Sequence, residues 1–119
     1  MREQQIHRLV ISALHCSGVC VIHVPMGGKR TQNSGRVMRS LGAPRGFPDL
    51  VILDPPPALP DKVGTALELK TVGGRLAPEQ KVWMDRLKER GWHVGVTYGD
   101  EQAFAFLTEA GYLPATPSH

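Results

Sequence analysis

The chain has 119 residues, of which 41% are hydrophobic and 21% charged, and its formal net charge is +3. This is enough for one domain with an ordinary core, and apolar runs of only a few residues exclude a membrane-spanning helix. An N-terminus without an apolar signal core, together with only 2 cysteines, argues against a secreted disulfide scaffold, so we expect an intracellular, reducing compartment.

The first elements in chain order are a helix, a strand and a long basic loop. Residues 3–16, EQQIHRLVISALHC, carry apolar residues at helical spacing, and Gly18 follows as a stop. The short β-branched run VCVIHV at 19–24 predicts a strand. Residues 25–47 are rich in glycine, polar and basic residues, so we expect a long exposed loop with a helical turn near residues 36–41.

The middle of the chain predicts two more strands and a second helix. PDLVIL at 48–53 is the second strand, and the following DPPPALPD is a stiff connector, because proline fixes φ and lacks an N–H. The third strand covers residues 64–70. APEQKVWMDRLKERG predicts an amphipathic helix with Pro78 in its first turn and Gly91 past its end. Its apolar stripe is expected to be Val82, Trp83 and Leu87.

The last part of the chain predicts a strand, a helix and a tail. WHVGVTY at 92–98 is the fourth strand, and DEQAFAFLTEAG is a helix capped by Asp100, followed by a fraying tail at 112–119. A helix between the third and fourth strands makes that pair parallel, whereas the first three strands can form an antiparallel meander. The order α-β-β-β-α-β-α therefore predicts one α/β domain over residues 1–119, with a mixed central sheet flanked by helices.

Basic residues are concentrated early in the chain. Residues 1–48 carry seven lysines and arginines and one acidic residue, which suggests a polyanionic partner such as nucleic acid, although a solvated basic loop has the same composition. The loop at 25–47 has almost no aromatic residues for stacking on single strands, so duplex or branched DNA fits better. Five of its residues are candidates to neutralise phosphates: Lys29, Arg30, Arg36, Arg39 and Arg45.

Three charged residues lie at predicted strand ends. Asp49 opens the second strand, while Glu68 and Lys70, two residues apart, face the same side of the third. If these strands are antiparallel neighbours, two carboxylates and one ammonium meet at one end of the sheet. Mg²⁺ prefers oxygen ligands, and an adjacent lysine stabilises developing charge in phosphodiester hydrolysis. The alternative is an ordinary ion pair between Glu68 and Lys70 on one strand face.

The stretch GFPDLVIL…ALELKTVGGRLAPEQKVW resembles the virus-type replication-repair nuclease (VRR-NUC) domains of the PD-(D/E)xK nuclease superfamily. It has their Pro-Asp strand, their Glu-x-Lys strand, a glycine-containing turn and a helix that starts at LAPEQ. The likeness covers about residues 3–98. Ala77 departs from the serine or threonine that usually caps this helix, which concerns helix stability rather than chemistry. The resemblance implies a restriction-endonuclease-like core and a metal-dependent DNA endonuclease that uses Mg²⁺, with Mn²⁺ as a substitute.

The resemblance also implies a role for each matching residue. Lys70 would be the catalytic lysine, and Gln80 would support the site or touch the substrate backbone. Glu3 matches an acid of the first helix and shares a helical face with Ile6 and Val10, although an acid that interacts with the helix dipole is an equal alternative. The implied catalytic residues are Asp49, Glu68, Lys70 and Gln80. The implied metal ligands are Asp49, Glu68, the backbone carbonyl of Leu69, and Glu3.

Stand-alone members of this family are similar in size and tend to act as homodimers on four-way (Holliday) junctions. The resemblance therefore implies a role in DNA repair, in the cytoplasm of a bacterial cell or a phage-infected host. Two alternatives stay open. One is a non-cleaving nucleic-acid-binding module of the same fold, and the other is a nuclease that acts on other duplex DNA or on RNA.

Other chemistry-bearing residues give weaker patterns. Cys16, Cys20 and His23 lack the second ligand pair of a structural zinc site, so we expect buried cysteines and a strand histidine. Trp83 and Trp92 are expected in the core. MGGK lacks the full phosphate-loop spacing, so no nucleotide cofactor is expected. The remaining histidines considered form no metal-binding motif: His7, His15 and His93.

Overall fold

The structure is a computed structural model that describes residues 1–24 and 44–115. Its elements in chain order are α1 (Glu3–Cys16), β1 (Val21–His23), β2 (Leu50–Ile52), β3 (Thr65–Lys70), α3 (Pro78–Glu89), β4 (His93–Tyr98) and α4 (Asp100–Ala110). The predicted order is confirmed. β1 and β2 have 3 residues each and are half as long as expected, whereas β3 and β4, with 6 residues each, are shorter by one residue. Among the described residues, no helix is long and apolar enough to cross a membrane.

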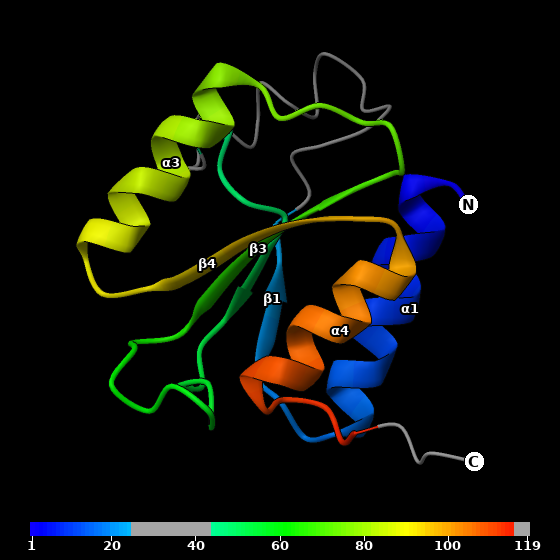
Figure 1. Cartoon of the computed structure of the whole chain (residues 1–119), viewed down its shortest axis with the longest axis vertical. Helices are drawn as coiled ribbons and strands as arrows, with labels where there is room; N and C mark the ends of the chain where they lie inside the picture. Colours follow the sequence, from blue (N-terminus) through cyan, green and yellow to red (C-terminus); the bar gives the residue numbers. More distant parts are fainter. Residues whose placement is uncertain (25–43, 116–119) are drawn as a thin grey trace.

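The four strands form one mixed sheet in the order β1-β2-β3-β4. β1 pairs antiparallel with β2, β2 pairs antiparallel with β3, and β3 pairs parallel with β4. Figure 1 shows α1 and α4 side by side on one side of this sheet and α3 on the other. The predicted meander, the parallel pair formed around a crossover helix, and the fold class are therefore confirmed.

The hydrophobic core lies between the sheet and the pair of helices α1 and α4. From β3, Leu67 and Leu69 enter this core, because alternate residues of a strand face the same side. Glu68, between them, faces the opposite side, where α3 lies. The helix α1 contributes residues at a spacing of four: Ile6, Val10 and Leu14.

The buried face of α3 differs from the predicted stripe. Met84 is the buried residue of this helix, Val82 is 47% exposed, and Trp83 and Leu87 are only half-buried. The physical reason is that Gln80, a polar residue, faces the sheet through a hydrogen bond to Glu68. The face of α3 toward the sheet therefore carries Gln80 and Met84, which are four residues apart. A prediction from the positions of apolar residues alone does not include Gln80 in this face.

The half-buried tryptophans are a second correction, since both were expected in the core. Trp83 makes an edge contact with Phe47, with ring centroids 5.5 Å apart, and Arg86 lies over its ring. Trp92 packs beside Gly64, where an added Cβ would meet its ring at 2.7 Å. Each indole thus covers a neighbouring segment and keeps part of its surface in solvent.

Three further local predictions are wrong. Cys16 and Cys20 are exposed, because one ends α1 and the other precedes the edge strand β1. Asp100 is the first residue of α4, and Gly99, with φ +87, stands at the N-cap position. The predicted tail begins too early, because Tyr112 and Leu113 are buried. The predicted helical turn at 36–41 lies outside the described residues.

Candidate active site

The pairing of β2 with β3 brings Asp49 and Glu68 together. Leu50 pairs with Leu67, so the next step of this antiparallel register sets Asp49 opposite Glu68. Asp49 Oδ2 accepts a hydrogen bond of 2.9 Å from the backbone N–H of Leu69. Both carboxyl residues are only 2% exposed, because β3 is a central strand and α3 covers this end.

Lys70 and Gln80 complete the surroundings of Glu68. Lys70 Nζ lies 3.5 Å from Glu68 Oε2, and Gln80 Nε2 donates a hydrogen bond of 2.9 Å to the same oxygen. Gln80 Oε1 also accepts a hydrogen bond of 2.8 Å from the backbone N–H of Ala77, at the N-terminus of α3. One glutamine therefore ties the start of α3 to Glu68 and satisfies the backbone N–H of Ala77, the half of a capping box that does not require a hydroxyl.

The pKa values of the two neighbouring carboxyl groups are shifted in opposite directions. Burial raises the pKa of Glu68 to about 9, and the adjacent Asp49 carboxylate adds to the rise, against the opposing effect of Lys70. Burial also acts to raise the pKa of Asp49, but the contacts with His7, Glu68 and the Leu69 N–H outweigh it and lower that pKa below its ordinary value. Without a cation, the site thus holds one carboxylate and one carboxylic acid near neutral pH.

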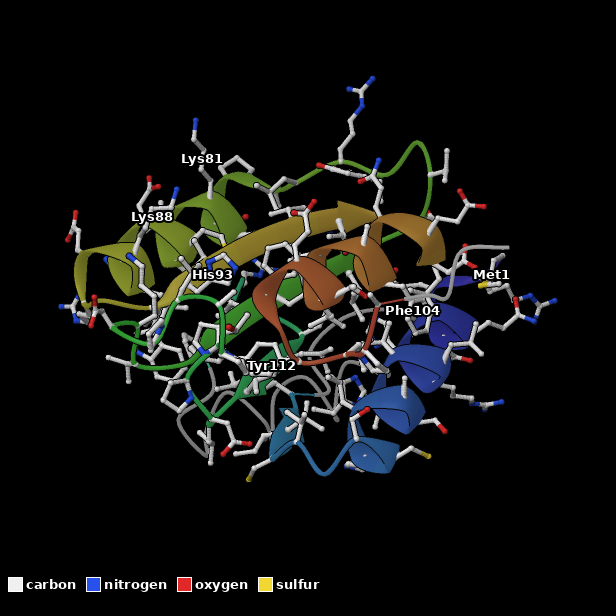
Figure 2. All side chains as sticks on the ribbon, turned by 60° about the horizontal axis from the view of Figure 1, so that its bottom comes forward. Met1, Lys81, Lys88, His93, Phe104 and Tyr112 are labelled. Carbon is white, nitrogen blue, oxygen red and sulfur yellow. The ribbon has the colours of Figure 1, made fainter. Side chains whose placement is uncertain are left out.

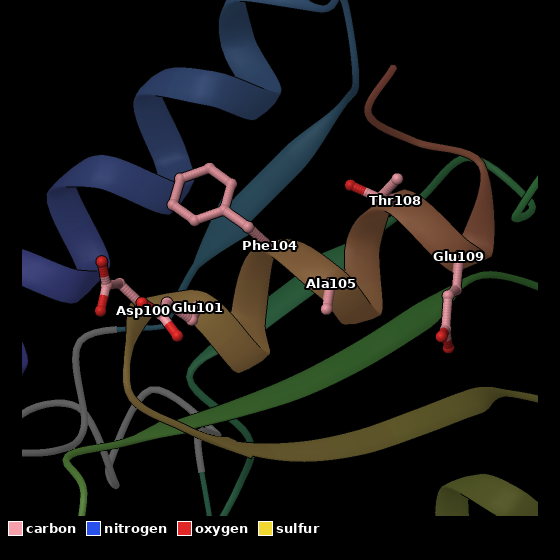
Figure 3. Close-up of a pocket in the computed structure, with 6 residues that line it drawn as sticks. All are labelled: Asp100, Glu101, Phe104, Ala105, Thr108 and Glu109. Carbon is pink, nitrogen blue, oxygen red and sulfur yellow. The ribbon is translucent and has the colours of Figure 1, made fainter. Parts of the chain in front are cut away.

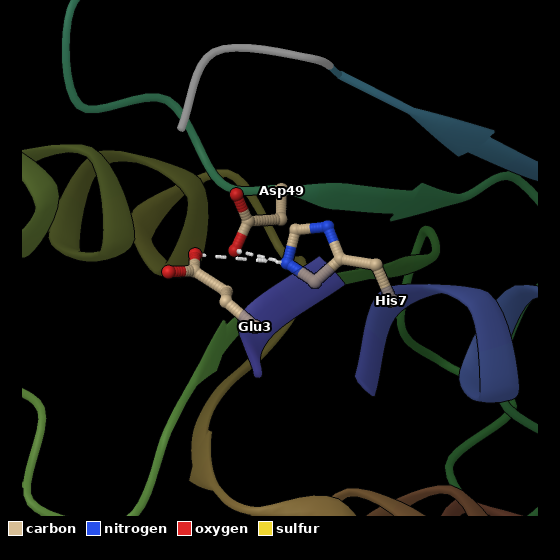
Figure 4. A group of neighbouring side chains, drawn as sticks. All are labelled: Glu3, His7 and Asp49. Atoms are coloured by element: carbon tan, nitrogen blue, oxygen red, sulfur yellow. Dashed lines mark ion pairs between the residues drawn. The ribbon is translucent and has the colours of Figure 1, made fainter. Parts of the chain in front are cut away.

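His7 belongs to this site, although sequence reasoning placed it in no motif. Its Nε2 lies 3.6 Å from Asp49 Oδ2 and 3.7 Å from Glu3 Oε1. Figure 4 shows the imidazole of His7 beside both carboxyl groups, with dashed lines from one ring nitrogen to an oxygen of each. The missed signal is the spacing of Glu3 and His7, four residues apart, which places both on one face of a helix.

The predicted site residues of the sheet and of α3 lie together. The loop predicted to contact DNA, residues 25–47, is called the DNA arm here, and only one of its five basic candidates is in the described part of the chain. Asp49, Glu68 and Lys70 converge at one end of the sheet, as their spacing requires. Arg45 is described and exposed. Four arm residues lie outside the described part of the chain: Lys29, Arg30, Arg36 and Arg39. The arm therefore stays a prediction.

The other predicted candidates lie apart from this cluster. His93 stacks on Phe106, with ring centroids 4.8 Å apart, and His15 is in the last turn of α1. In residues 1–24 and 44–115, the three side chains grouped closely enough to hold a metal ion are those of Glu3, His7 and Asp49, so no zinc cluster forms around the two cysteines there.

A surface depression on α4 is a poor alternative site. All six residues that line it come from this one helix, and three of them are carboxylates, Asp100, Glu101 and Glu109 (Figure 3). It contains no lysine, arginine or histidine. Its negative charge would repel a polyanionic substrate.

Comparisons with known proteins identify the family and the fold of this chain. The family model of the VRR-NUC domain matches residues 1–101. A solved structure described as a VRR_NUC domain protein superposes with a TM-score of 0.72 at 19% sequence identity, covering 95% of this chain and 90% of that chain. No curated protein matches the sequence. At this sequence identity, the similarity to the solved structure shows the fold alone.

Proposed function

Because the chain belongs to the VRR-NUC domain family, which indicates a nuclease of the PD-(D/E)xK type, we propose that it is a metal-dependent DNA endonuclease that hydrolyses phosphodiester bonds in branched DNA such as four-way junctions. The observation that carries the proposal is the convergence of Asp49 and Glu68, both buried, beside the ammonium of Lys70. An ordinary ion pair at a protein surface does not require two carboxyl groups to be buried together.

The donor atoms fit a divalent cation. In the described part of the chain, Glu68 Oε1 is buried without a hydrogen-bond partner, so one oxygen of this carboxyl remains available. Asp49, Glu68 and the backbone carbonyl of Leu69 would hold the ion, with Glu3 as a further oxygen ligand from α1. When bound, a divalent cation lowers the pKa of its water and offsets charge on the phosphoryl group.

Each remaining residue has a defined task in this proposal. Gln80 binds Glu68 Oε2, which fixes the carboxyl so that Oε1 faces away from that bond. Lys70, next to the same carboxyl, orients the attacking water or stabilises the additional negative charge of the transition state. The burial of Glu68 and Asp49 keeps bulk water away from the charges that carry the reaction.

The choice of a branched substrate rests on charge and on symmetry. A basic N-terminal part favours a polyanion, and the scarcity of aromatic residues in segment 25–47 argues against single-strand stacking. A homodimer would place two equivalent active sites around a two-fold axis, which suits a four-way junction. Cleavage of other duplex DNA or of RNA uses the same catalytic residues, so a substrate panel decides between these targets.

The test is a cleavage panel with labelled junction, flap, splayed-arm, linear and single-stranded DNA and RNA. We expect the protein to cut the junction with Mg²⁺ or Mn²⁺ and not with EDTA. Asp49→Asn and Lys70→Ala should abolish cutting while DNA binding persists. Lys88→Ala, on the exposed surface of α3 (Figure 2), is the matched control. Full cleavage activity of either variant would show that the active site is assigned wrongly. Binding without cutting by the wild-type protein would favour the non-cleaving module.

A further inference from the structure

Tyr98, the last residue of β4, lies beside Lys70, the last residue of β3. The two strands are parallel, and their register pairs these two residues directly. Beyond this pair, the backbone N–H of Gly99 donates a hydrogen bond of 2.8 Å to the carbonyl oxygen of Lys70, so the pairing continues to the end of both strands. Paired residues of neighbouring strands point to the same face of a sheet. Tyr98 therefore shares with Lys70 the face that carries Glu68.

On this face, the site residues follow one another across three strands. Asp49 precedes β2, Glu68 and Lys70 are on β3, and Tyr98 is on β4. Neighbouring strands are about 4.8 Å apart, and lysine and tyrosine each carry a hydrogen-bond donor at the far end of a long side chain. A DNA backbone that crosses the strands from the two carboxyl groups over Lys70 would therefore next meet Tyr98.

The two tyrosines of the chain differ in what their hydroxyl groups contact. The Tyr112 hydroxyl lies 2.8 Å from Thr65 Oγ1 and donates a hydrogen bond of 2.6 Å to the carbonyl oxygen of Asp54, in a buried position. Tyr98 is half-buried, and its backbone N–H donates to Gln102 Oε1. Within residues 1–24 and 44–115, its hydroxyl has no hydrogen-bond partner. This hydroxyl is therefore available to a ligand.

We propose that Tyr98 binds the substrate and that its hydroxyl donates a hydrogen bond to the DNA phosphate next to the one that is cut. The inference rests on the proposed function, because it takes the reacting phosphate to lie at Asp49, Glu68 and Lys70. Tyrosine hydroxyls contact phosphates in protein–DNA complexes, and such contacts fix the register of the duplex without reading bases. The competing arrangement is a base stacked on the ring of Tyr98. The half-burial of this ring favours a contact through the hydroxyl at its tip.

The test is the binding of the full chain to a labelled four-way junction in Ca²⁺, measured by fluorescence anisotropy. We expect Tyr98→Phe to bind about tenfold more weakly than the wild type, because it loses a hydrogen bond to a charged group. Tyr112→Phe, the matched control at the other tyrosine, should bind like the wild type. Urea unfolding should show the reverse pattern, with stability lost by Tyr112→Phe and kept by Tyr98→Phe.

Two further measurements identify the contact. Neutral methylphosphonates are placed one at a time along the cut strand of the junction. At the phosphate that Tyr98 binds, this change should weaken binding by the wild type, whereas Tyr98→Phe should lose little there, because both changes remove the same hydrogen bond. In cleavage with Mg²⁺, Tyr98→Phe should raise KM about tenfold and keep kcat, since the contact is equal in the bound substrate and the transition state.

The outcomes separate this inference from the proposed function. Wild-type affinity of Tyr98→Phe overturns the phosphate contact, and with weaker binding by Tyr98→Ala it would indicate stacking instead. Losses by Tyr98→Phe that match those of the wild type at every methylphosphonate also overturn it. A wild-type protein that binds the junction without cutting it would contradict the proposed nuclease, while the binding comparison still decides the role of Tyr98. No binding by the wild type would overturn both proposals.

Discussion

Replacing Glu68 by glutamine should change how the stability of the metal-free protein depends on pH. Burial raises the pKa of Glu68 from an ordinary 4.5 to about 9, with a further contribution from Asp49. Between these values the native state holds a proton that the unfolded chain has released. The stability contribution of this group is therefore complete below its unfolded pKa and is lost as the pH rises through its folded pKa.

The size of the effect follows from one proton. A full difference of one bound proton changes the free energy of unfolding by about 1.4 kcal/mol per pH unit, so from about pH 6 to about pH 8 the wild-type protein loses at most about 2.7 kcal/mol through Glu68. Glutamine cannot titrate and resembles the protonated acid in shape. We therefore expect the free energy of unfolding of Glu68→Gln to rise, relative to that of the wild type, by up to this amount between about pH 6 and about pH 8. The lowered pKa of Asp49 affects stability only below about pH 3.8, its ordinary pKa, which is outside this pH range.

The assay is urea unfolding in EDTA at several pH values, with Trp83 and Trp92 as fluorescent probes. Glu89→Gln, at the exposed end of α3, is the matched control and should follow the wild type. Parallel stability curves for the wild type and Glu68→Gln would refute the assignment of a proton to this buried site. A wild-type slope that flattens in saturating Mn²⁺ would agree with a cation that replaces the proton.

Three other sets of substitutions test separate parts of the structure. Gln80→Ala removes the bond to Glu68 and one at the N-terminus of α3, so we expect a loss of about 1–2 kcal/mol in urea unfolding and slower cleavage; unchanged kinetics would contradict its supporting role. Tyr112→Phe removes hydroxyl contacts with Thr65 and Asp54 and should cost about 1 kcal/mol by the same assay, whereas no loss would indicate a frayed tail. Neutralising arginines of the predicted arm should lower the slope of log binding constant against log salt by about 0.9 for each phosphate that they bind, and an unchanged slope would exclude the arm. The arginines to neutralise together are Arg36, Arg39 and Arg45.

Much of the fold and the centre of the site could be predicted because the deciding information is local. Helical spacing and Gly18, with φ +73, define α1, and the order of strands and helices leaves few topologies. The meander then forces the start of β2 beside the end of β3. The convergence of Asp49 and Glu68 therefore follows from strand order and the alternation of side chains along a strand.

The missed features depend on tertiary packing. His7 becomes part of the site only because the N-terminal turns of α1 lie against Asp49, and no spacing within the helix specifies that neighbour. The buried face of α3 was misplaced because Gln80 bonds to a buried acid. Tyr112 is fixed by residues far away in sequence, Thr65 among them. The pattern of apolar residues alone thus does not predict the position of polar residues that bond to buried partners.

The anomalous X-ray signal of Mn²⁺ in crystals of the wild-type protein would locate the bound ion directly. We expect an ion within bonding distance of both Asp49 and Glu68, with the ammonium of Lys70 beside it. An ion bound elsewhere, with the two carboxyl groups left unligated at saturating Mn²⁺, would contradict it.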